Sequence, residues 1–190
     1  MNKKTTLILL VLALVAVIVG ASVLYRTLGQ SVVPDQLATW EPSQTAPTQA
    51  PLMPAPDFTV YDVDGKEVKL SDFFGTPLVV NFWASWCGPC KMEMPDFQEK
   101  YLQLGAEVTF LMVNMTDGSR ETVGTASDFI ARQGYTFPVF YDTASSAAMA
   151  YRVYSLPTTF FIDAEGHAVA QATGAIDADT LRRGIEMICP

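Results

Sequence analysis

Two cysteines, Cys87 and Cys90, are separated by two residues in the segment Trp86-Cys87-Gly88-Pro89-Cys90. A nearly continuous apolar run ends at Trp83, just before them, and a segment with helical character follows. A helix N-terminus presents free N–H groups and a partial positive charge, which stabilise a thiolate. We therefore expect Cys87 to be the nucleophile and Cys90 to form an intramolecular disulfide with it.

The residues around the two cysteines fit this interpretation. Pro89 suits the first helical turn, because its missing N–H would be unpaired there. Gly88 lets a partner chain approach, and Trp86 is expected to shield the sulfur and contact that partner. The alternatives are a structural disulfide or half of a zinc site. Zinc would need a second pair of ligands, and only Cys189 and His167 remain outside the motif.

Residues 57–190 alternate between strand and helix patterns, which predicts an α/β fold with helices on both faces of the sheet. Pro95 falls inside the first expected helix and is expected to kink it. The last helix should carry Cys189 as an unpaired thiol. The expected strands are residues 58–63, 67–70, 78–83, 108–113, 137–141, 158–162 and 167–173, and the expected helices are residues 87–104, 122–133, 145–151 and 177–188.

Residues 1–26 are predicted to form a transmembrane anchor. The run from Thr5 to Tyr25 carries no charge, and as a helix it would span about 31 Å, close to the hydrocarbon core of a bilayer. Lys3 and Lys4 precede the run, so the positive-inside rule places the N-terminus in the cytoplasm and the later residues outside. A cleaved signal peptide is the alternative, with residues 19–21 as the cleavage site.

Residues 27–56 are predicted to form a linker, because they contain half of the 12 prolines with Ser, Thr and Gln between them. This composition is typical of an extended, semi-rigid spacer. The remaining block, residues 57–190, is the expected globular domain.

The composition excludes several classes of protein. The chain has 12 Lys and Arg against 20 Asp and Glu, a formal net charge of −8, which argues against binding to nucleic acid. Hydrophobic residues make up 49% and charged residues 17%, so the chain can bury a core and is not disordered overall. Three cysteines are too few for a small disulfide-stapled protein.

The segment from Val80 to Pro95 resembles the active-site segment of the thioredoxin superfamily. More narrowly, it is similar to the TlpA/ResA-like membrane-anchored thiol–disulfide oxidoreductases, in the redoxin branch that includes AhpC/TSA proteins. The segment from Leu156 to Asp163 matches the second signature of that family. The resemblance covers about residues 56–188. It implies a thioredoxin fold, a central mixed sheet flanked by helices, with an N-terminal β-hairpin and an inserted strand–helix element between Asp117 and Tyr141.

The resemblance also implies roles for single residues. Pro157 should follow a cis peptide bond and face the two cysteines, and the backbone of Leu156 should pair with the substrate. Asn81 stands where soluble thioredoxins carry a buried Asp, and Asn cannot titrate. A base for Cys90 would then be a water or another carboxylate, of which Glu93 is the nearest in sequence. The other interpretation of Glu93 is a solvated helix carboxylate.

The expected function is that of an extracytoplasmic, single-pass membrane enzyme that reduces disulfides in exported proteins, such as apocytochrome c or repair enzymes. Its only redox group would be the Cys87–Cys90 pair, with no metal and no other cofactor. The family implies a membrane thiol transporter of the DsbD/CcdA type as electron donor. The alternatives are a peroxidase of the AhpC/TSA type, a thiol oxidase and a non-enzymatic binding module. The peroxidase pattern Pro-x-x-x-Thr-x-x-Cys is absent from the sequence.

Overall fold

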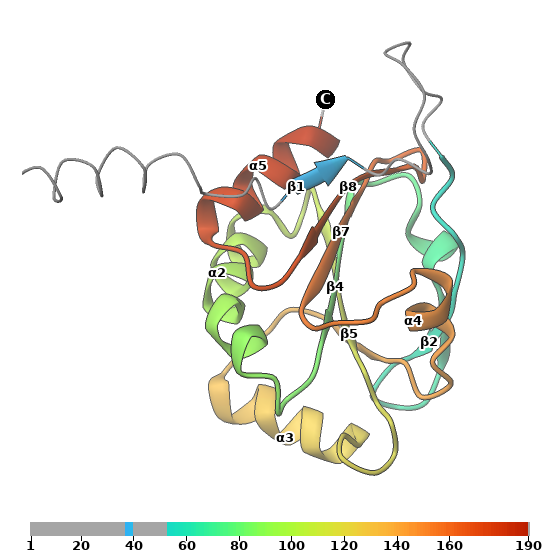
Figure 1. Cartoon of the computed structure of the whole chain (residues 1–190), viewed down its shortest axis with the longest axis vertical. Coiled ribbons are helices and arrows are strands. Elements are labelled where there is room, and N and C mark those ends of the chain that lie inside the picture. The colour runs from blue at the N-terminus through green and yellow to red at the C-terminus, as the bar shows by residue number, and fades with distance from the viewer. Residues whose placement is uncertain (1–36, 40–52, 190) are drawn as a thin grey trace, which may run out of the picture. The chain divides into compact units, whose positions relative to one another are not determined.

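The computed structural model describes residues 37–39 and 53–189, which build one sheet of eight strands with helices on both faces (Figure 1). The strand order is β1-β8-β7-β4-β5-β6-β2-β3. The strands are β1 (Leu37–Thr39), β2 (Thr59–Tyr61), β3 (Glu67–Lys69), β4 (Leu78–Trp83), β5 (Thr109–Asn114), β6 (Val139–Tyr141), β7 (Thr158–Ile162) and β8 (Ala168–Thr173). The helices are the 3-10 helix η1 (Leu70–Phe73), α2 (Gly88–Leu104), α3 (Val123–Gln133), α4 (Ser146–Ala150) and α5 (Ala178–Ile188).

Strand β4 forms the centre of the sheet. All six of its residues are buried, as expected for a strand covered on both faces. It pairs in parallel with β5 and antiparallel with β7, so the sheet is mixed. The strand predicted over residues 78–83 is therefore confirmed.

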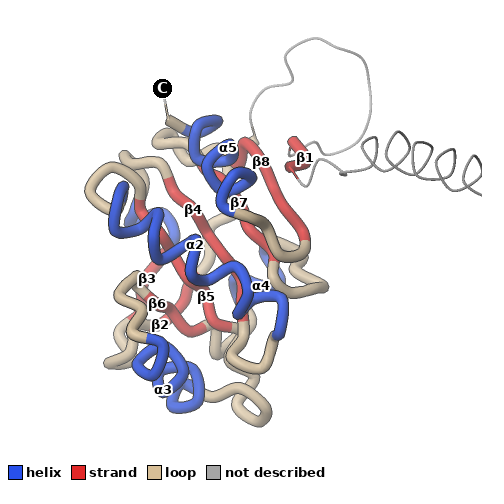
Figure 2. The backbone as a smooth tube through the Cα atoms, turned by 90° about the vertical axis from the view of Figure 1, so that its left-hand side faces the viewer, coloured by secondary structure: helices blue, strands red, loops and turns tan. Residues whose placement is uncertain are grey.

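The two faces of the sheet carry separate apolar clusters. Val79 belongs to one cluster and Val80 to the other, because successive strand residues point to opposite faces. The first cluster includes residues of α2, α3 and α5, and the second includes residues of η1 and α4. Figure 2 shows α2, α3 and α5 together on one face of the strands. The prediction of helices on both faces is confirmed.

Local capping sets the ends of the helices close to the predicted positions. Thr122 caps α3 by accepting a hydrogen bond from the N–H of Thr125, and Asp177 does the same for α5 through Thr180. Helix α3 ends at Gly134, which has φ +70°, a left-handed conformation that glycine adopts without strain. Helix α2 continues through Pro95 to Leu104.

The two ends of the sheet differ from each other in how well they were predicted. The hairpin of β2 and β3 agrees with the sequence and joins the sheet through β6. Strand β1 was not predicted. It lies within the expected linker and pairs antiparallel with β8, with Leu37 opposite Ala172. Further along, Ala55 is buried and its N–H donates to the carbonyl of Gly166, so the packed domain includes residues before the boundary predicted at residue 57.

No helix among residues 53–189 is long and apolar enough to cross a membrane. The anchor predicted over residues 1–26 lies outside the described residues, as does most of the linker predicted over residues 27–56.

Candidate active site at the junction of β4 and α2

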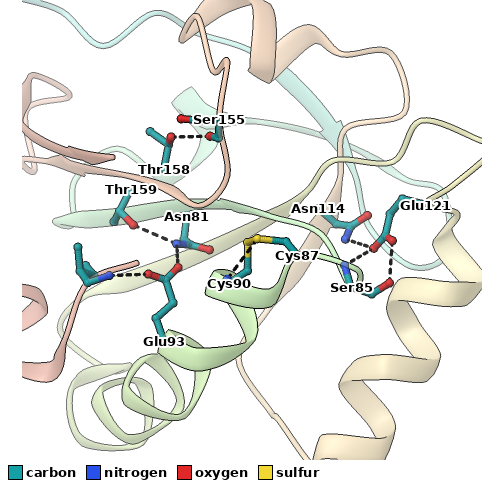
Figure 3. The surroundings of a disulfide bond; sticks show 11 residues. Asn81, Ser85, Cys87, Cys90, Glu93, Asn114, Glu121, Ser155, Thr158 and Thr159 are labelled. Carbon is teal, nitrogen blue, oxygen red and sulfur yellow. Dashed lines mark hydrogen bonds between the residues drawn. A yellow bond between two sulfur atoms is a disulfide. The ribbon is translucent and has the colours of Figure 1, made fainter. Parts of the chain in front are cut away.

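Cys87 and Cys90 are joined by a disulfide where β4 leads into α2 (Figure 3). Cys87 is the N-cap of α2, and its Sγ accepts a hydrogen bond from the N–H of Cys90 at 3.2 Å. The predicted position at a helix N-terminus is therefore confirmed. Cys90 is fully buried, whereas Cys87 is 4% exposed and lines a surface groove. A partner molecule can reach only the first sulfur.

The groove beside Cys87 has a volume of about 580 Å³. Its walls come from three segments: the active-site turn, the loop after β5 and the segment before β7. Two aromatic side chains lie at its surface, Trp86 with 40% and Tyr154 with 90% of its area exposed. The lining residues are Trp86, Cys87, Gly88, Pro89, Met115, Asp117, Arg120, Val153, Tyr154, Ser155 and Leu156.

The peptide bond between Leu156 and Pro157 is cis, as the resemblance implied. Leu156 is half-buried and lines the groove, and Pro157 is buried. Strand β7 begins at the next residue, Thr158, which pairs with Phe82 of β4. This pairing brings the cis-proline segment to the same end of the sheet as the disulfide.

Glu93 is buried, with 2% of its surface exposed, so its interpretation as a solvated helix carboxylate is wrong. It lies one helical turn after Cys90, on the buried face of α2. One carboxylate oxygen accepts a hydrogen bond from the side-chain amide of Asn81 at 2.8 Å, and the other accepts from the N–H of Ile176 at 2.9 Å. Asn81 also donates to the hydroxyl of Thr159. The residue that replaces the thioredoxin Asp thus binds a carboxylate supplied by the helix.

Burial raises the pKa of Glu93 from 4.5 to about 7, because desolvation disfavours the charged form. The hydrogen bonds from Ile176 and Asn81 act in the opposite direction, since they stabilise the carboxylate. A carboxyl group with a pKa near neutrality can accept or release a proton at physiological pH.

A second buried carboxylate, Glu121, was not singled out from the sequence. It accepts hydrogen bonds from the N–H and hydroxyl of Ser85 at 2.8 and 2.7 Å and from the amide of Asn114 at 2.7 Å. Ser85 lies two residues before Cys87, so Glu121 ties the loop after β5 to the active-site turn. In Figure 3 the Glu93 and Glu121 networks lie on either side of the disulfide. The sequence gave no signal for Glu121, because a Glu just before a helix is common. Its burial becomes visible only in the tertiary structure.

Arg120 contacts Trp86 across the groove surface. The guanidinium carbon lies 3.7 Å from the centre of the indole ring, which is a cation–π contact. The sequence predicted that Trp86 lies at the site, and the structure places it there. The sequence did not indicate that Arg120 is its neighbour.

The structure brings together most of the predicted site residues. Trp86, Gly88, Pro89 and Leu156 line the groove with Cys87. Cys90, Glu93 and Pro157 are buried behind them. Cys189 is a free thiol at the end of α5 and lies outside this groove, as expected for an unpaired cysteine.

Comparisons with known proteins agree with the geometry. Residues 52–171 match the AhpC/TSA family. The chain is 37% identical over 137 residues to the thiol-disulfide oxidoreductase ResA of Geobacillus kaustophilus, covering 72% of this chain and 76% of that protein. ResA of Bacillus subtilis is 35% identical over 137 residues, covering 72% and 74%. A thioredoxin family thiol:disulfide interchange protein from Chlorobium tepidum superposes with a TM-score of 0.64 at 27% identity, covering 74% of this chain and 99% of that one.

Replacement of Glu121 tests whether it braces the active-site turn. Glu121→Ala would leave three donors without an acceptor, one on the buried Asn114 and two on the half-buried Ser85, so we expect a loss of about 2–4 kcal/mol in the free energy of unfolding. Glu121→Gln keeps one acceptor oxygen, and its amide can donate to the Ser85 hydroxyl, so the expected loss is below about 1 kcal/mol. Denaturant unfolding of the full-length oxidised protein measures both. Equal losses in the two variants would contradict the bracing role.

The pKa of Glu93 predicts a pH dependence of stability. The native state holds the Glu93 proton up to pH about 7, whereas the unfolded chain loses it near 4.5. The free energy of unfolding should therefore fall as the pH rises through this window, by about 3 kcal/mol from this group. Glu93→Gln should remove that slope, and Glu99→Gln, an exposed change on the same helix, should keep it. Denaturant unfolding at several pH values measures this dependence. If the free energy of unfolding changed with pH in the same way in all three proteins, the raised pKa of Glu93 would be refuted.

Proposed function

Because the chain belongs to the AhpC/TSA family and is a ResA-like thiol–disulfide oxidoreductase, we propose that it reduces disulfides in exported proteins. The observation that supports this most is the asymmetry of the two sulfurs. Cys87 lines an open groove, whereas Cys90 is buried on the helix face that carries Glu93. This arrangement suits an attacking thiolate and a resolving thiol.

The first step is the attack of the Cys87 thiolate on one sulfur of a substrate disulfide. A new bond forms between that sulfur and Cys87, the substrate S–S bond breaks, and the second substrate sulfur leaves as a thiolate. The N–H of Cys90, which donates to Cys87 Sγ in the oxidised protein, stabilises the negative charge of the attacking sulfur. Trp86, Gly88 and Pro89 surround this sulfur, and the Leu156 backbone before Pro157 pairs with the substrate chain.

The second step is the attack of Cys90 on the mixed disulfide. The Cys90 thiol must lose its proton, and Glu93, with its pKa near 7, is the group that takes it, directly or through a water. The Cys90 thiolate then displaces the substrate sulfur from Cys87. The substrate leaves as a dithiol, having gained two electrons, and the Cys87–Cys90 disulfide seen in the structure forms.

The direction, location and electron supply are parts of the same proposal. The dipeptide Gly88-Pro89 between the cysteines is the arrangement of reducing thioredoxins, whose potential is about −270 mV, against about −120 mV for the oxidant DsbA. A reductase outside the cytoplasm needs a dedicated donor, and residues 5–25 as a membrane anchor would keep it beside a thiol transporter of the DsbD/CcdA type. Apocytochrome c and repair enzymes are the candidate substrates. The cysteine pair serves as the only redox group.

Trapping tests the roles of the two sulfurs. Cys90→Ser removes the resolving thiol, so Cys87 should remain joined to the substrate in a mixed disulfide. We expect such adducts with exported proteins on non-reducing gels, and their loss in the Cys87→Ser/Cys90→Ser double variant. Adducts that form in Cys87→Ser and disappear in Cys90→Ser would reverse the two roles.

The reducing direction predicts a low potential. Equilibration of the full-length protein in dithiothreitol buffers should give a value well below about −120 mV. Acid-quench alkylation of whole cells should find the pair mostly reduced, since a donor would keep it so. A potential near that of DsbA, or a pair almost wholly oxidised in cells with the donor intact, would mean that the protein works as an oxidase.

The membrane anchor is tested by extraction. Carbonate washing should leave the full-length chain with the membranes, because a spanning helix is not released by high pH. Protease added from outside should remove the domain by cutting before residue 57. A soluble product that begins near Ser22 would show a cleaved signal peptide instead, with export retained.

A further inference from the structure

We propose that Arg120 makes the groove selective for disulfides that have an acidic side chain next to the target cysteine. This inference rests on the proposed function and narrows its substrate class. It follows from three observations: the contact between Arg120 and Trp86, the guanidinium N–H donors that have no partner in this contact, and the other charges in the groove lining.

The contact with Trp86 is close enough for the guanidinium to stack with its flat face on the ring. The guanidinium carbon lies 3.7 Å from the ring centre, and a cation–π contact of this kind leaves the N–H donors at the edge of the plane free. These donors form a fork that fits a carboxylate in two parallel hydrogen bonds. Among the described residues, the ring of Trp86 is the only partner of the Arg120 side chain. A carboxylate from a bound peptide can therefore occupy this edge.

The loop that carries Arg120 is fixed relative to Cys87. Asp117 accepts hydrogen bonds from the N–H groups of Ser119 and Glu121, which close the loop on one side. On the other side, Glu121 binds Ser85 in the active-site turn. Arg120 lies between these two attachment points, so a substrate does not need to order the loop when it binds.

The groove lining carries one charge of each sign. Arg120 is the only basic residue in the lining, and Asp117 is the only acidic one. One oxygen of Asp117 accepts hydrogen bonds from the loop itself. The domain as a whole is acidic, but charges beyond about 8 Å are screened at physiological ionic strength. The free edge of the Arg120 guanidinium is therefore the charged group of the lining that we expect to bind a side chain of the peptide.

The topology places Arg120 on the path of a bound peptide. Its loop follows β5, and Leu156 precedes β7, while β5 and β7 flank β4 on either side. Cys87 follows β4, between these two walls. A peptide whose backbone pairs with Leu156 while its cysteine meets Cys87 has its neighbouring side chains within the same groove as Arg120.

Peptides that differ in one charge test the inference. The probes are three peptides, each with one cysteine joined to pyridine-2-thiol as a mixed disulfide, and with Glu, Gln or Lys beside that cysteine. Attack by reduced, full-length protein in nonionic detergent forms the Cys87–peptide disulfide and releases pyridine-2-thione, whose absorbance gives the second-order rate constant of this single turnover. We expect the Glu peptide to react about three- to fivefold faster than the Lys peptide at low salt, the range of an exposed ion pair, and the difference to shrink as salt rises.

The ratio of the Glu to the Lys rate is compared within each variant, so changes in the intrinsic reactivity of Cys87 cancel. Arg120→Gln should bring the ratio to about one, Arg120→Glu should invert it, and Arg120→Lys should keep part of it. Arg132→Gln makes the same charge change in the last turn of α3, away from the groove, and should keep the wild-type ratio. A wild-type ratio near one, or a ratio that Arg120→Gln does not change, would overturn the inference while leaving the reductase proposal intact. No reaction with the Gln peptide would overturn both.

Discussion

The connection between β4 and α2 is only four residues long, and its last residue is Cys87. Strand β4 is buried and held by β5 and β7 on its two sides, while α2 packs Met94 and Phe97 into the core beside it. Neither element can shift without disturbing the core. The sulfur is therefore fixed where the strand ends and the helix begins, in the place that an oxygen takes in most N-caps. The other two walls of the groove lie there because they adjoin the neighbours of β4.

The two buried glutamates beside the disulfide show two uses of the same group. Each is held by an asparagine from a central strand, Asn81 for Glu93 and Asn114 for Glu121. Glu121 accepts three hydrogen bonds from neutral donors and holds two loops together. Glu93 accepts only two, and burial moves its pKa to about 7. With two donors, part of the desolvation cost of Glu93 stays uncompensated, which suits this carboxylate to exchange protons.

The sequence predicted the elements that have a strong pattern of their own. Strand β4 is a continuous apolar run and α3 has a capping threonine and a terminal glycine, so their bounds came close to those observed. Strand β1 has three residues, and its position depends on a pairing with β8 that no local pattern encodes. The cysteine pair and the cis proline were found from their motifs. The burial of Glu121 and the contact of Arg120 with Trp86 arise from segments far apart in the chain, and the sequence alone does not report such distances.

The pairing of β1 with β8 also sets the length of any tether. If residues 5–25 span the bilayer as we propose, the tether between the membrane and the sheet consists of residues 26–36. Eleven residues can reach at most about 40 Å when fully extended. A tether that extended to residue 56, the end of the predicted linker, would reach at most about 110 Å. The volume that the active site could explore grows steeply with tether length, so under this proposal three backbone-paired residues at a sheet edge would raise the effective concentration of the dithiol at the membrane surface.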